Sequence, residues 1–187
     1  MTKNLVAIII GATVALSSAH GAKSTSPSNA AKLTCLKARQ DSQSARAAKD
    51  LEAQEEFSKI SVQKCANMFD NERLADAYED LAFIALERKQ SENALKAAQS
   101  CITAVYDNTS CHLHKAQALS LLWKNRESLK SLNSTKLLIE HKTRRVRNQM
   151  EAGATMDERT SLQSTIDLLD TQAQFVDLLI KEQDTLP

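Results

Sequence analysis

The chain has 187 residues with 24 basic and 23 acidic side chains, and this balance gives no reason to expect nucleic acid or an anionic membrane as its partner. Aromatic residues make up only 4%, so a core must be built from Leu, Ala, Ile and Val. From Ser28 to Leu186 there is one glycine, Gly153, and no proline. Sheets need such residues in their turns, whereas runs of Ala, Leu, Lys, Glu and Gln favour helices. The composition therefore predicts an all-α fold.

Residues 1–21 have the features of a cleaved secretory signal peptide. Lys3 precedes an apolar stretch from Leu5 to Leu16, and small residues follow up to a cleavage point after Gly21, with Ala19 as a second option. The apolar stretch of about 12 residues is shorter than the roughly 20 that span a membrane, although an uncleaved anchor is the competing interpretation. Residues 22–28 form a Ser-rich, flexible lead-in. We therefore expect a periplasmic or secreted protein with no stable membrane span after cleavage.

About seven helices are expected after the lead-in, because apolar residues recur there at helical spacing. The first five cover residues 29–49, 52–68, 72–89, 92–105 and 111–124. Side chains suited to N-cap positions precede the last three of these. The expected caps are Asp70 or Asn71, then Ser91, and then Thr109 or Ser110.

The last two helices are expected over residues 126–152 and 156–183, as a long hairpin within a C-terminal unit of residues 126–187. Gly153 stands where a glycine ends a helix, and Thr155 with Glu158 matches a capping box. Apolar residues of the seventh helix alternate spacings of four and three, as in a coiled coil: Leu162, Ile166, Leu169, Ala173, Val176 and Ile180. This seam is expected to pack on the sixth helix.

Four cysteines follow the signal peptide, and an even number in an exported chain indicates disulfides. Cys101 and Cys111 flank a polar turn between two expected helices, and Cys35 and Cys65 lie at equal distances from Asp50, near the first break. Residues equidistant from the turn of an antiparallel hairpin face each other. The predicted pairs are therefore Cys35–Cys65 and Cys101–Cys111.

Zinc is the alternative role for one of these cysteines, because Cys111, His112 and His114 lie close together in the sequence. Neighbouring positions on a helix diverge by about 100°, so the two histidines do not converge if the segment is helical. There is also no CxxC or HExxH motif. We expect no metal site and no cofactor.

The sequence carries a weak internal repeat. Residues 92–98 resemble residues 126–132 at a shift of 34, which is the period of the tetratricopeptide repeat. Residues 38–140 resemble that family, with Tyr78 at the first-helix aromatic position and Ala94 at the small position of the second helix. Ala98 stands where the family has a large aromatic residue, and the loop glycine and terminal proline are missing.

A shift back onto residues 38–71 retains only Ala48 and Leu51 at first-helix positions. The resemblance implies that residues 29–125 form an antiparallel array of helical hairpins, with a generic α-hairpin array as the alternative. It also implies a partner-binding groove lined by first-helix residues: Asp76, Glu79, Phe83, Leu113, Gln117 and Leu121. Phe83 and Leu121 are the expected apolar anchors, unless Phe83 simply packs on a neighbouring helix.

The one basic run consists of Lys142, Arg144, Arg145 and Arg147. Because the seventh helix is acidic, we interpret this run as complementary charge within the last hairpin, with an anionic partner as the alternative. Neither a GxSxG motif nor a Gly-rich phosphate loop is present, so we expect no enzyme, no small-molecule substrate and no nucleic acid.

The sequence thus predicts an exported scaffold that holds an envelope or secretion-system protein. A secreted effector or inhibitor of another protein, and a subunit that self-associates through the 162–180 seam, are the alternatives.

Overall fold

Long runs of helix-favouring residues, with few glycines or prolines to interrupt them, fold into helices joined by short turns. The structure, a computed structural model, describes residues 27–68 and 70–184. The helices of this part are α1 (Pro27–Ala47), α2 (Leu51–Ala66), α3 (Asn71–Glu87), α4 (Ser91–Ala104), α5 (Thr109–Leu121), α6 (Asn125–Glu151) and α7 (Met156–Asp184). The expected signal peptide and all but the end of the lead-in lie outside the described residues. The predicted all-α fold with seven helices is confirmed.

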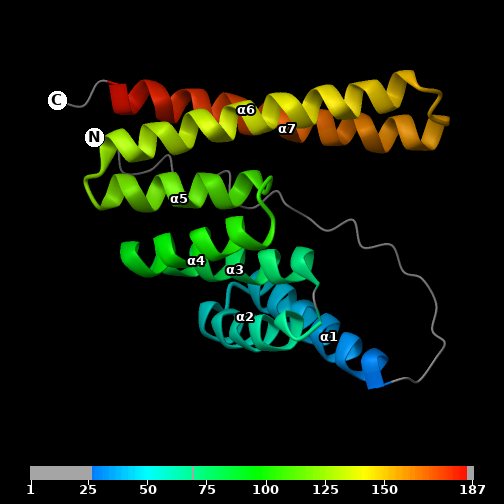
Figure 1. Cartoon of the computed structure of the whole chain (residues 1–187), viewed down its shortest axis with the longest axis vertical. Coiled ribbons are helices and arrows are strands. Elements are labelled where there is room, and N and C mark those ends of the chain that lie inside the picture. The colour runs from blue at the N-terminus through cyan, green and yellow to red at the C-terminus, as the bar shows by residue number, and fades with distance from the viewer. Residues whose placement is uncertain (1–26, 69, 185–187) are drawn as a thin grey trace.

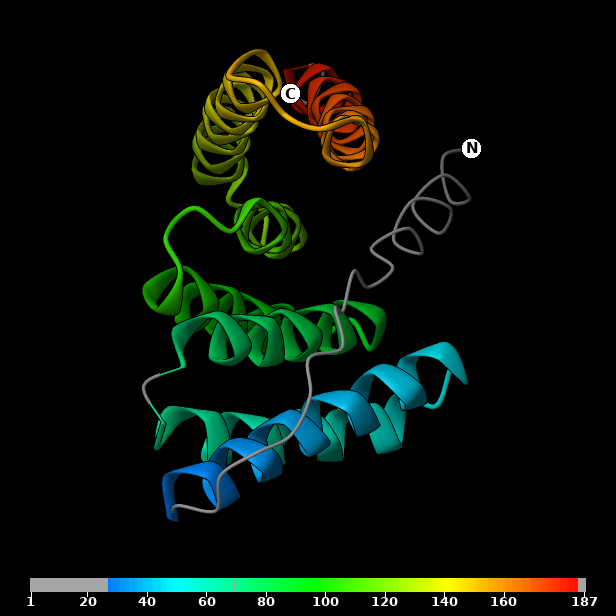
Figure 2. The same cartoon turned by 90° about the vertical axis from the view of Figure 1, so that its right-hand side faces the viewer.

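The helices pack as a series of antiparallel pairs. We call α1–α2 hairpin 1 and α3–α4 hairpin 2, while hairpin 3 is α5 with the first half of α6. The pairs lie in successive layers, with hairpin 1 at one end of the molecule (Figures 1 and 2). The C-terminal hairpin, α6–α7, forms the other end and projects well beyond α5 (Figure 1). The expected boundary at residues 125 and 126 therefore falls inside hairpin 3.

The same turn joins the two helices in each of hairpins 1 to 3. One residue of each turn has a positive φ, and the next residue donates its N–H to a carbonyl five positions back, as in a Schellman motif. The positive-φ residues are Lys49, Lys89 and Trp123, with φ of 59°, 57° and 60°. The donor–acceptor pairs are Asp50–Ala45, Gln90–Ala85 and Lys124–Leu119.

These turns give the true register of the repeat. Lys89 and Trp123 lie 34 positions apart, as the self-comparison of the sequence indicated, but Lys49 and Lys89 lie 40 apart. The shift of 34 onto residues 38–71 was therefore wrong for hairpin 1, because Ala48 and Leu51 lie beside its turn instead of within a first helix. The reason is length: α2 and α3 have 16 and 17 residues, whereas α4 and α5 have 14 and 13.

Most of the expected helix ends are confirmed. The Asp70 side chain accepts a hydrogen bond from Arg73 N–H and caps α3. Gly153 follows the end of α6 with φ of 104°, a conformation that disfavours side chains. Thr155 and Glu158 form the predicted capping box, because the Thr155 N–H and hydroxyl donate to the Glu158 carboxylate and Glu158 N–H donates to Thr155 Oγ1.

Two predicted caps were wrong. Helix α4 begins at Ser91 itself, and Gln90 holds the N-cap position without a side-chain hydrogen bond. Helix α5 begins at Thr109, so neither Thr109 nor Ser110 caps it. Asn108 is the cap instead, because its Oδ1 accepts a hydrogen bond from Cys111 N–H at 3.2 Å.

The largest apolar core of the described residues lies in the C-terminal hairpin and reaches α5. Its buried members are Ala116, Leu132, Ile139, Val146, Ile166, Leu169 and Val176. Leu162, Ala173 and Ile180 pack against this cluster, so the whole predicted seam of α7 lies inside the hairpin. Smaller clusters centre on Ala75, Cys101 and Cys111, and on Ala85, Ala94 and Ala118.

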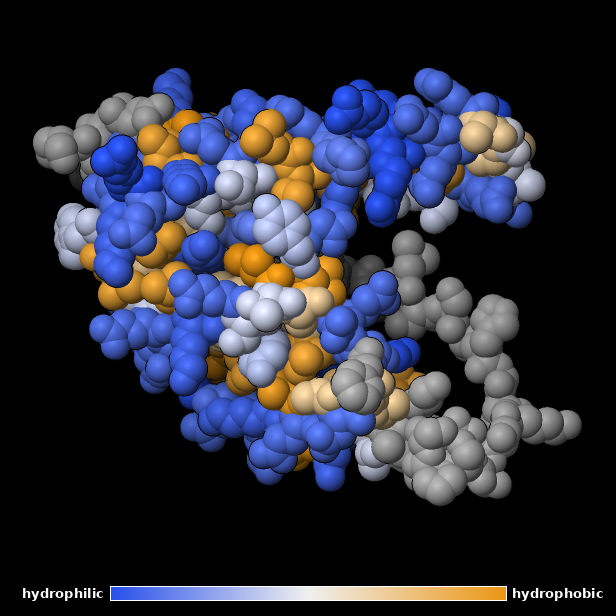
Figure 3. All heavy atoms as spheres, in the orientation of Figure 1, coloured by the Kyte–Doolittle hydropathy of each residue, from blue (hydrophilic) through white to orange (hydrophobic). Residues whose placement is uncertain are grey.

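On the face seen in Figure 3, apolar side chains lie in patches among polar ones, and the projecting end of the C-terminal hairpin is mostly hydrophilic. Within the residues that the structure describes, no helix has the length and apolar character needed to cross a membrane.

Candidate functional site

The first helices of the three hairpins lie next to one another. Helix α3 packs against α1 on one side and against α5 on the other. Polar and aromatic side chains of these three helices meet along the contacts, and we call this surface the first-helix face. Its members are Arg39 and Arg46 of α1, Asp76, Glu79, Asp80 and Phe83 of α3, and His114 and Gln117 of α5.

A buried carboxylate, that of Asp80, forms the centre of the α1–α3 contact. Arg39 Nη1 donates to Asp80 Oδ2 at 2.5 Å, and Arg46 Nη1 donates to Oδ1 at 3.4 Å. The hydroxyls of Ser42 and Ser58 donate to Oδ2 at 2.8 and 3.4 Å. Four donors therefore replace the water that this carboxylate loses on burial.

Phe83 links α1 to α5. The Arg46 guanidinium carbon lies 5.1 Å from the centroid of the Phe83 ring, which is the geometry of a cation–π contact. The centroid of the His114 ring lies 6.5 Å from the same ring on the α5 side. Phe83 is only partly buried, so part of this residue stays accessible while its ring contacts both neighbouring helices.

Two further carboxylates of α3 lie beside this core. Asp76 is 51% exposed, and one of its oxygens lies 3.8 Å from Arg39 Nη2. Burial raises the pKa of Asp76 to about 6, and Arg39 opposes the rise. Because half of the side chain is exposed to water, solvation offsets part of the free-energy cost of keeping this carboxylate charged. Burial also raises the pKa of Glu79, although its Oε2 accepts a hydrogen bond from Asn108 Nδ2 at 3.3 Å. A basic segment of a partner would remove the cost of keeping both groups charged.

The two histidines of α5 bind different neighbours. His112 Nε2 donates to the Tyr106 carbonyl at 2.8 Å, whereas His114 Nδ1 donates to Gln117 Oε1 at 3.3 Å. Burial lowers the pKa of both rings, and that of His114 falls to about 4. Cys111 is bonded to Cys101. Among the described residues, no group of three or more His, Cys, Asp or Glu side chains is placed to hold a metal ion.

Four of the six residues predicted for the groove lie on the first-helix face: Asp76, Glu79, Phe83 and Gln117. Leu121 is 52% exposed in the last position of α5. Leu113 packs against the core of the C-terminal hairpin. Phe83 packs on neighbouring helices, as the alternative interpretation held, but it also stays partly accessible. A groove that holds a partner stays a prediction.

Three charged members of the face, Arg39, Arg46 and Asp80, were not predicted from the sequence. Asp80 interrupts the apolar stripe of α3 between Ala77 and Ile84, at spacings of three and four. Arg39 interrupts the corresponding stripe of α1, beside the buried Ala38. A lone charge on each of two packing faces, with opposite signs, was the signal for a buried ion pair.

Both predicted disulfides are present. Cys35 and Cys65 join α1 to α2 with a Cα–Cα distance of 5.1 Å, and Cys101 and Cys111 join α4 to α5 with 6.1 Å. All four cysteines are completely buried. Each bond lies between helices that are neighbours in an antiparallel pair, which is the geometry expected from the spacing of the cysteines.

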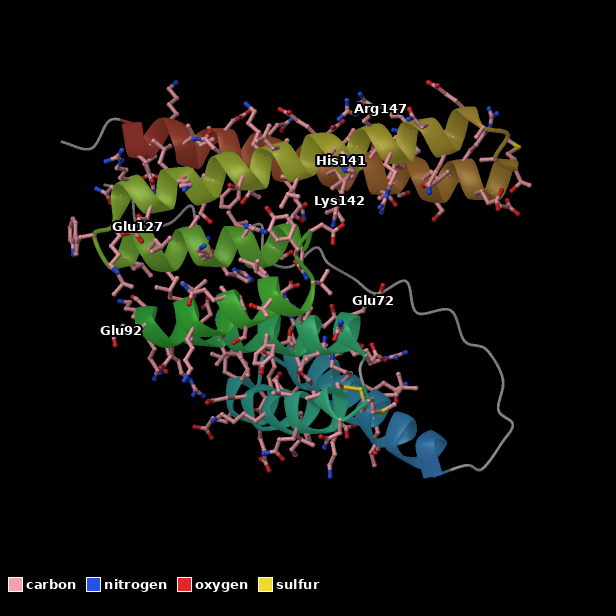
Figure 4. The ribbon with its side chains drawn as sticks, viewed as in Figure 1. Glu72, Glu92, Glu127, His141, Lys142 and Arg147 are labelled. Atoms are coloured by element: carbon pink, nitrogen blue, oxygen red, sulfur yellow. A yellow bond between two sulfur atoms is a disulfide. The ribbon has the colours of Figure 1, made fainter. Side chains whose placement is uncertain are left out.

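The basic run of α6 is matched by α7 only in part. Arg147 lies 3.9 Å from Asp170 of α7, and Lys136 nearby donates to Asp177 at 2.8 Å. Lys142 is instead 3.9 Å from Asp107, in the α4–α5 connection. Figure 4 shows Arg147 and Lys142 leaving α6 in different directions. Arg144 and Arg145 are exposed and form no ion pair with any residue in the described ranges.

No protein-family model, curated protein or solved structure matches this chain. The resemblance to the tetratricopeptide repeat therefore stays a prediction.

Proposed function

We propose that the chain is an exported scaffold that holds another protein on its first-helix face. The observation that carries this proposal is the alignment of α1, α3 and α5 side by side. Together they present partly accessible charged and aromatic side chains, among them Asp76, Glu79 and Phe83, that the apolar clusters of the described residues do not use. Stacked helical hairpins commonly bind peptides or helices on such a surface.

The chemistry of the face suggests what it would bind. Glu79 lies about one helical turn from Phe83 and Asp76 about two, with Glu72 exposed one turn before Asp76. Arg39 and Arg46 are largely occupied by Asp80. The accessible charge that α3 adds to the first-helix face is therefore acidic, and a partner segment with Lys or Arg beside an apolar residue fits it best.

The disulfides support export. Two buried disulfides in a chain of this size are typical of an oxidising compartment, such as the periplasm or the cell exterior. The proposed location also rests on the expected signal peptide, whose residues 1–21 lie outside the described part.

Self-association through the 162–180 seam has less support than the scaffold. The side chains of that seam pack inside the α6–α7 hairpin, so they are not available to a second copy while the hairpin is closed.

The test is crosslinking in producing cells with a C-terminally tagged full-length chain, followed by purification from cells and from medium and identification of captured proteins by mass spectrometry. We expect one envelope or secretion-system protein, and its recovery should fall at least fivefold in Phe83→Ala and in Asp76→Lys/Glu79→Lys. Circular dichroism checks that each variant is folded.

Leu137→Ala is the matched control, because Leu137 is 66% exposed on α6, away from the first-helix face. This variant should capture the same protein in the same amount. Capture that survives the α3 substitutions but is lost in Leu137→Ala would place the binding surface elsewhere. Recovery of the chain alone, or only from the medium, would favour self-assembly or a secreted effector instead.

A further inference from the structure

Hairpin 1 has an unusually polar interior. Among the buried side chains described in it, no apolar one is larger than alanine or cysteine. They are Cys35, Ala38, Arg39, Ser42, Ala45, Gln54, Ser58, Ser61 and Cys65. None of these residues belongs to the apolar clusters of the described chain. The larger apolar side chains of α2, among them Leu51, Phe57, Ile60 and Val62, are only partly buried. The hydrophobic effect, which scales with buried apolar area, therefore holds hairpin 1 in place less firmly than the hairpins that have buried apolar clusters.

The shared turns allow a position-by-position comparison with hairpin 2. Counted from Lys49 and Lys89, four of the five buried polar residues of hairpin 1 occupy positions that small apolar residues occupy in hairpin 2. The matched pairs are Ser42 with Ala82, Gln54 with Ala94, Ser58 with Ala98, and Ser61 with Cys101. The same backbone geometry thus accepts small apolar side chains at all four positions in hairpin 2, whereas all four are polar in hairpin 1. Hairpin 3, counted from Trp123, has polar residues at two of them, the buried Ser128 and Thr135.

The ionic network adds little net stability to the closed hairpin. Asp80 accepts hydrogen bonds from Arg39, Ser42 and Ser58, but the same groups regain water when α1 and α2 move away from α3. The desolvation of a buried ion pair offsets most of its Coulombic gain. The side-chain amide of Gln54 is also buried, and neither its nitrogen nor its oxygen finds a partner among the described residues. Opening would let water bind this amide as well.

One covalent bond counteracts this weakness. The Cys35–Cys65 disulfide ties the first half of α1 to the last turn of α2, across a sequence separation of 30. A bond of this kind stabilises the closed form mainly by restricting the open one.

The second disulfide has a different environment. Cys101 and Cys111 lie in an apolar cluster with Ala75, against which Tyr78, Ile102 and Val105 pack. Both disulfides are fully buried, so a reductant reaches either one only after local opening. Opening around Cys101–Cys111 exposes apolar surface, whereas opening of hairpin 1 exposes mainly groups that water solvates well.

We propose that hairpin 1 opens as a separate unit and that its Cys35–Cys65 disulfide is a redox-controlled latch. A dithiol reductant attacks the disulfide through a thiolate, forms a mixed disulfide and is then oxidised to its own disulfide. Its two electrons and two protons leave Cys35 and Cys65 as thiols. Hairpin 1 then separates from α3, while hairpins 2 and 3 and the C-terminal hairpin stay folded on their apolar clusters.

Opening also changes the first-helix face. Arg39 and Arg46 leave Asp80, and Phe83 loses its cation–π contact with Arg46. The face of α3 would then be more acidic and more open. That this alters partner binding rests on the proposed function, but the opening itself does not.

The test uses the protein as purified after export, with both disulfides oxidised, and needs no partner. Native protein is treated with graded dithiothreitol, free thiols are trapped with iodoacetamide at intervals, and the alkylated cysteines are located by mass spectrometry. The Cys101–Cys111 bond in the same molecule is the control. We expect Cys35 and Cys65 to become alkylated at least ten times faster. Equal rates, or faster reduction of Cys101–Cys111, would overturn the proposal.

Amide hydrogen-exchange rates then test whether hairpin 1 opens while the rest of the protein stays folded. In Cys35→Ser/Cys65→Ser, amides of residues 51–66 should exchange at least tenfold faster than in the oxidised protein, while those of residues 109–121 and 156–184 keep their rates. Unchanged exchange over 51–66, or loss of protection in all three segments, would overturn the idea of a separate unit. The outcome of the partner capture does not affect either readout, so failure of this inference and failure of the proposed function are distinguishable.

Discussion

Arg39 of α1 and Asp80 of α3 form a buried ion pair, with 2.5 Å between Nη1 and Oδ2 and less than a tenth of either side chain exposed. The pair joins hairpin 1 to hairpin 2, and Arg46, Ser42 and Ser58 are the other donors to the carboxylate. Removal of one partner leaves the other charge buried without compensation, whereas opening of the hairpin releases both to water. The closed state is thus specific in its geometry, although the pair contributes little net stability.

Asp80→Ala should therefore destabilise the oxidised protein strongly. We expect a loss of about 3–5 kcal/mol in the free energy of unfolding, because Arg39 stays buried and keeps only the half-exposed Asp76 carboxylate, 3.8 Å away, as its ionic partner. Urea titration followed by circular dichroism measures the change. Asp41→Ala is the matched control: Asp41 pairs with the exposed Lys37 at 2.7 Å, and its loss should change stability by no more than about 1 kcal/mol. Equal effects of the two substitutions would contradict a buried pair.

Replacement of both charges tests the same idea from the other side. Arg39→Met/Asp80→Leu removes the ion pair and fills the site with apolar groups, so it should recover most of the stability lost in Asp80→Ala. A double variant less stable than Asp80→Ala would show that Ser42, Ser58 and Arg46 depend on the carboxylate more than the geometry suggests.

His114 should make the protein less stable in mild acid. Burial lowers the pKa of His114 from 6.5 to about 4, so the folded state keeps the ring neutral while the unfolded chain binds a proton. Stability that is present above pH 6.5 is therefore lost as the pH falls toward 4. The loss for this one group reaches roughly 3 kcal/mol at most.

Asp76 and Glu79 act in the opposite direction. Their pKa values are raised in the folded state, so they favour folding as the pH falls through those values. Comparison with His114→Gln separates the two effects, because only the histidine contribution disappears. Urea titrations at several pH values should show the wild type losing stability relative to this variant below pH 6.5. Parallel pH profiles of the two proteins would mean that the ring is protonated in the fold.

Trp123 holds a turn position that does not suit its side chain. Its φ is 60° and 87% of the residue is exposed, so burial does not offset the cost of the left-handed conformation. Asparagine tolerates this conformation better. Trp123→Asn should therefore raise the free energy of unfolding by up to about 1 kcal/mol, and Trp123→Val should lower it. The midpoints of thermal unfolding of the two variants and the wild type check this order of stability. A valine variant more stable than the wild type would contradict the assigned turn geometry.

The sequence predicted the helices and disulfides because both depend on local patterns. Every helix boundary lies within about three residues of the predicted one, since polar turns and the near absence of glycine leave few alternatives. The pairing of Cys35 with Cys65 follows once α1 and α2 are antiparallel. By contrast, the contact of Asp80 with α1 depends on the angle between two hairpins, and no local pattern determines that angle.

The same difference explains two other errors. The 40-residue spacing from Lys49 to Lys89 comes from small additions to α2 and α3 that a fixed period does not reveal. Lys142 lies on a face of α6 that meets the α4–α5 connection, so it pairs with Asp107 instead of with α7. The net charges of two helices indicate that the helices attract each other, but they do not show on which face of its helix each charged residue lies.

The seam of α7 gives a test of the C-terminal hairpin. Leu169 is 7% exposed in the cluster that joins α7 to α6, so Leu169→Lys places a charge in an apolar interior. We expect a loss of at least about 3 kcal/mol in the free energy of unfolding, with no change in the sedimentation coefficient of the folded protein. Asp167→Lys is the control, since Asp167 is exposed on the same helix and should change stability by less than about 1 kcal/mol. If Leu169→Lys instead left stability unchanged and converted an oligomer to monomers, the seam would lie between copies of the chain, and a self-associating subunit would replace the scaffold as the better account.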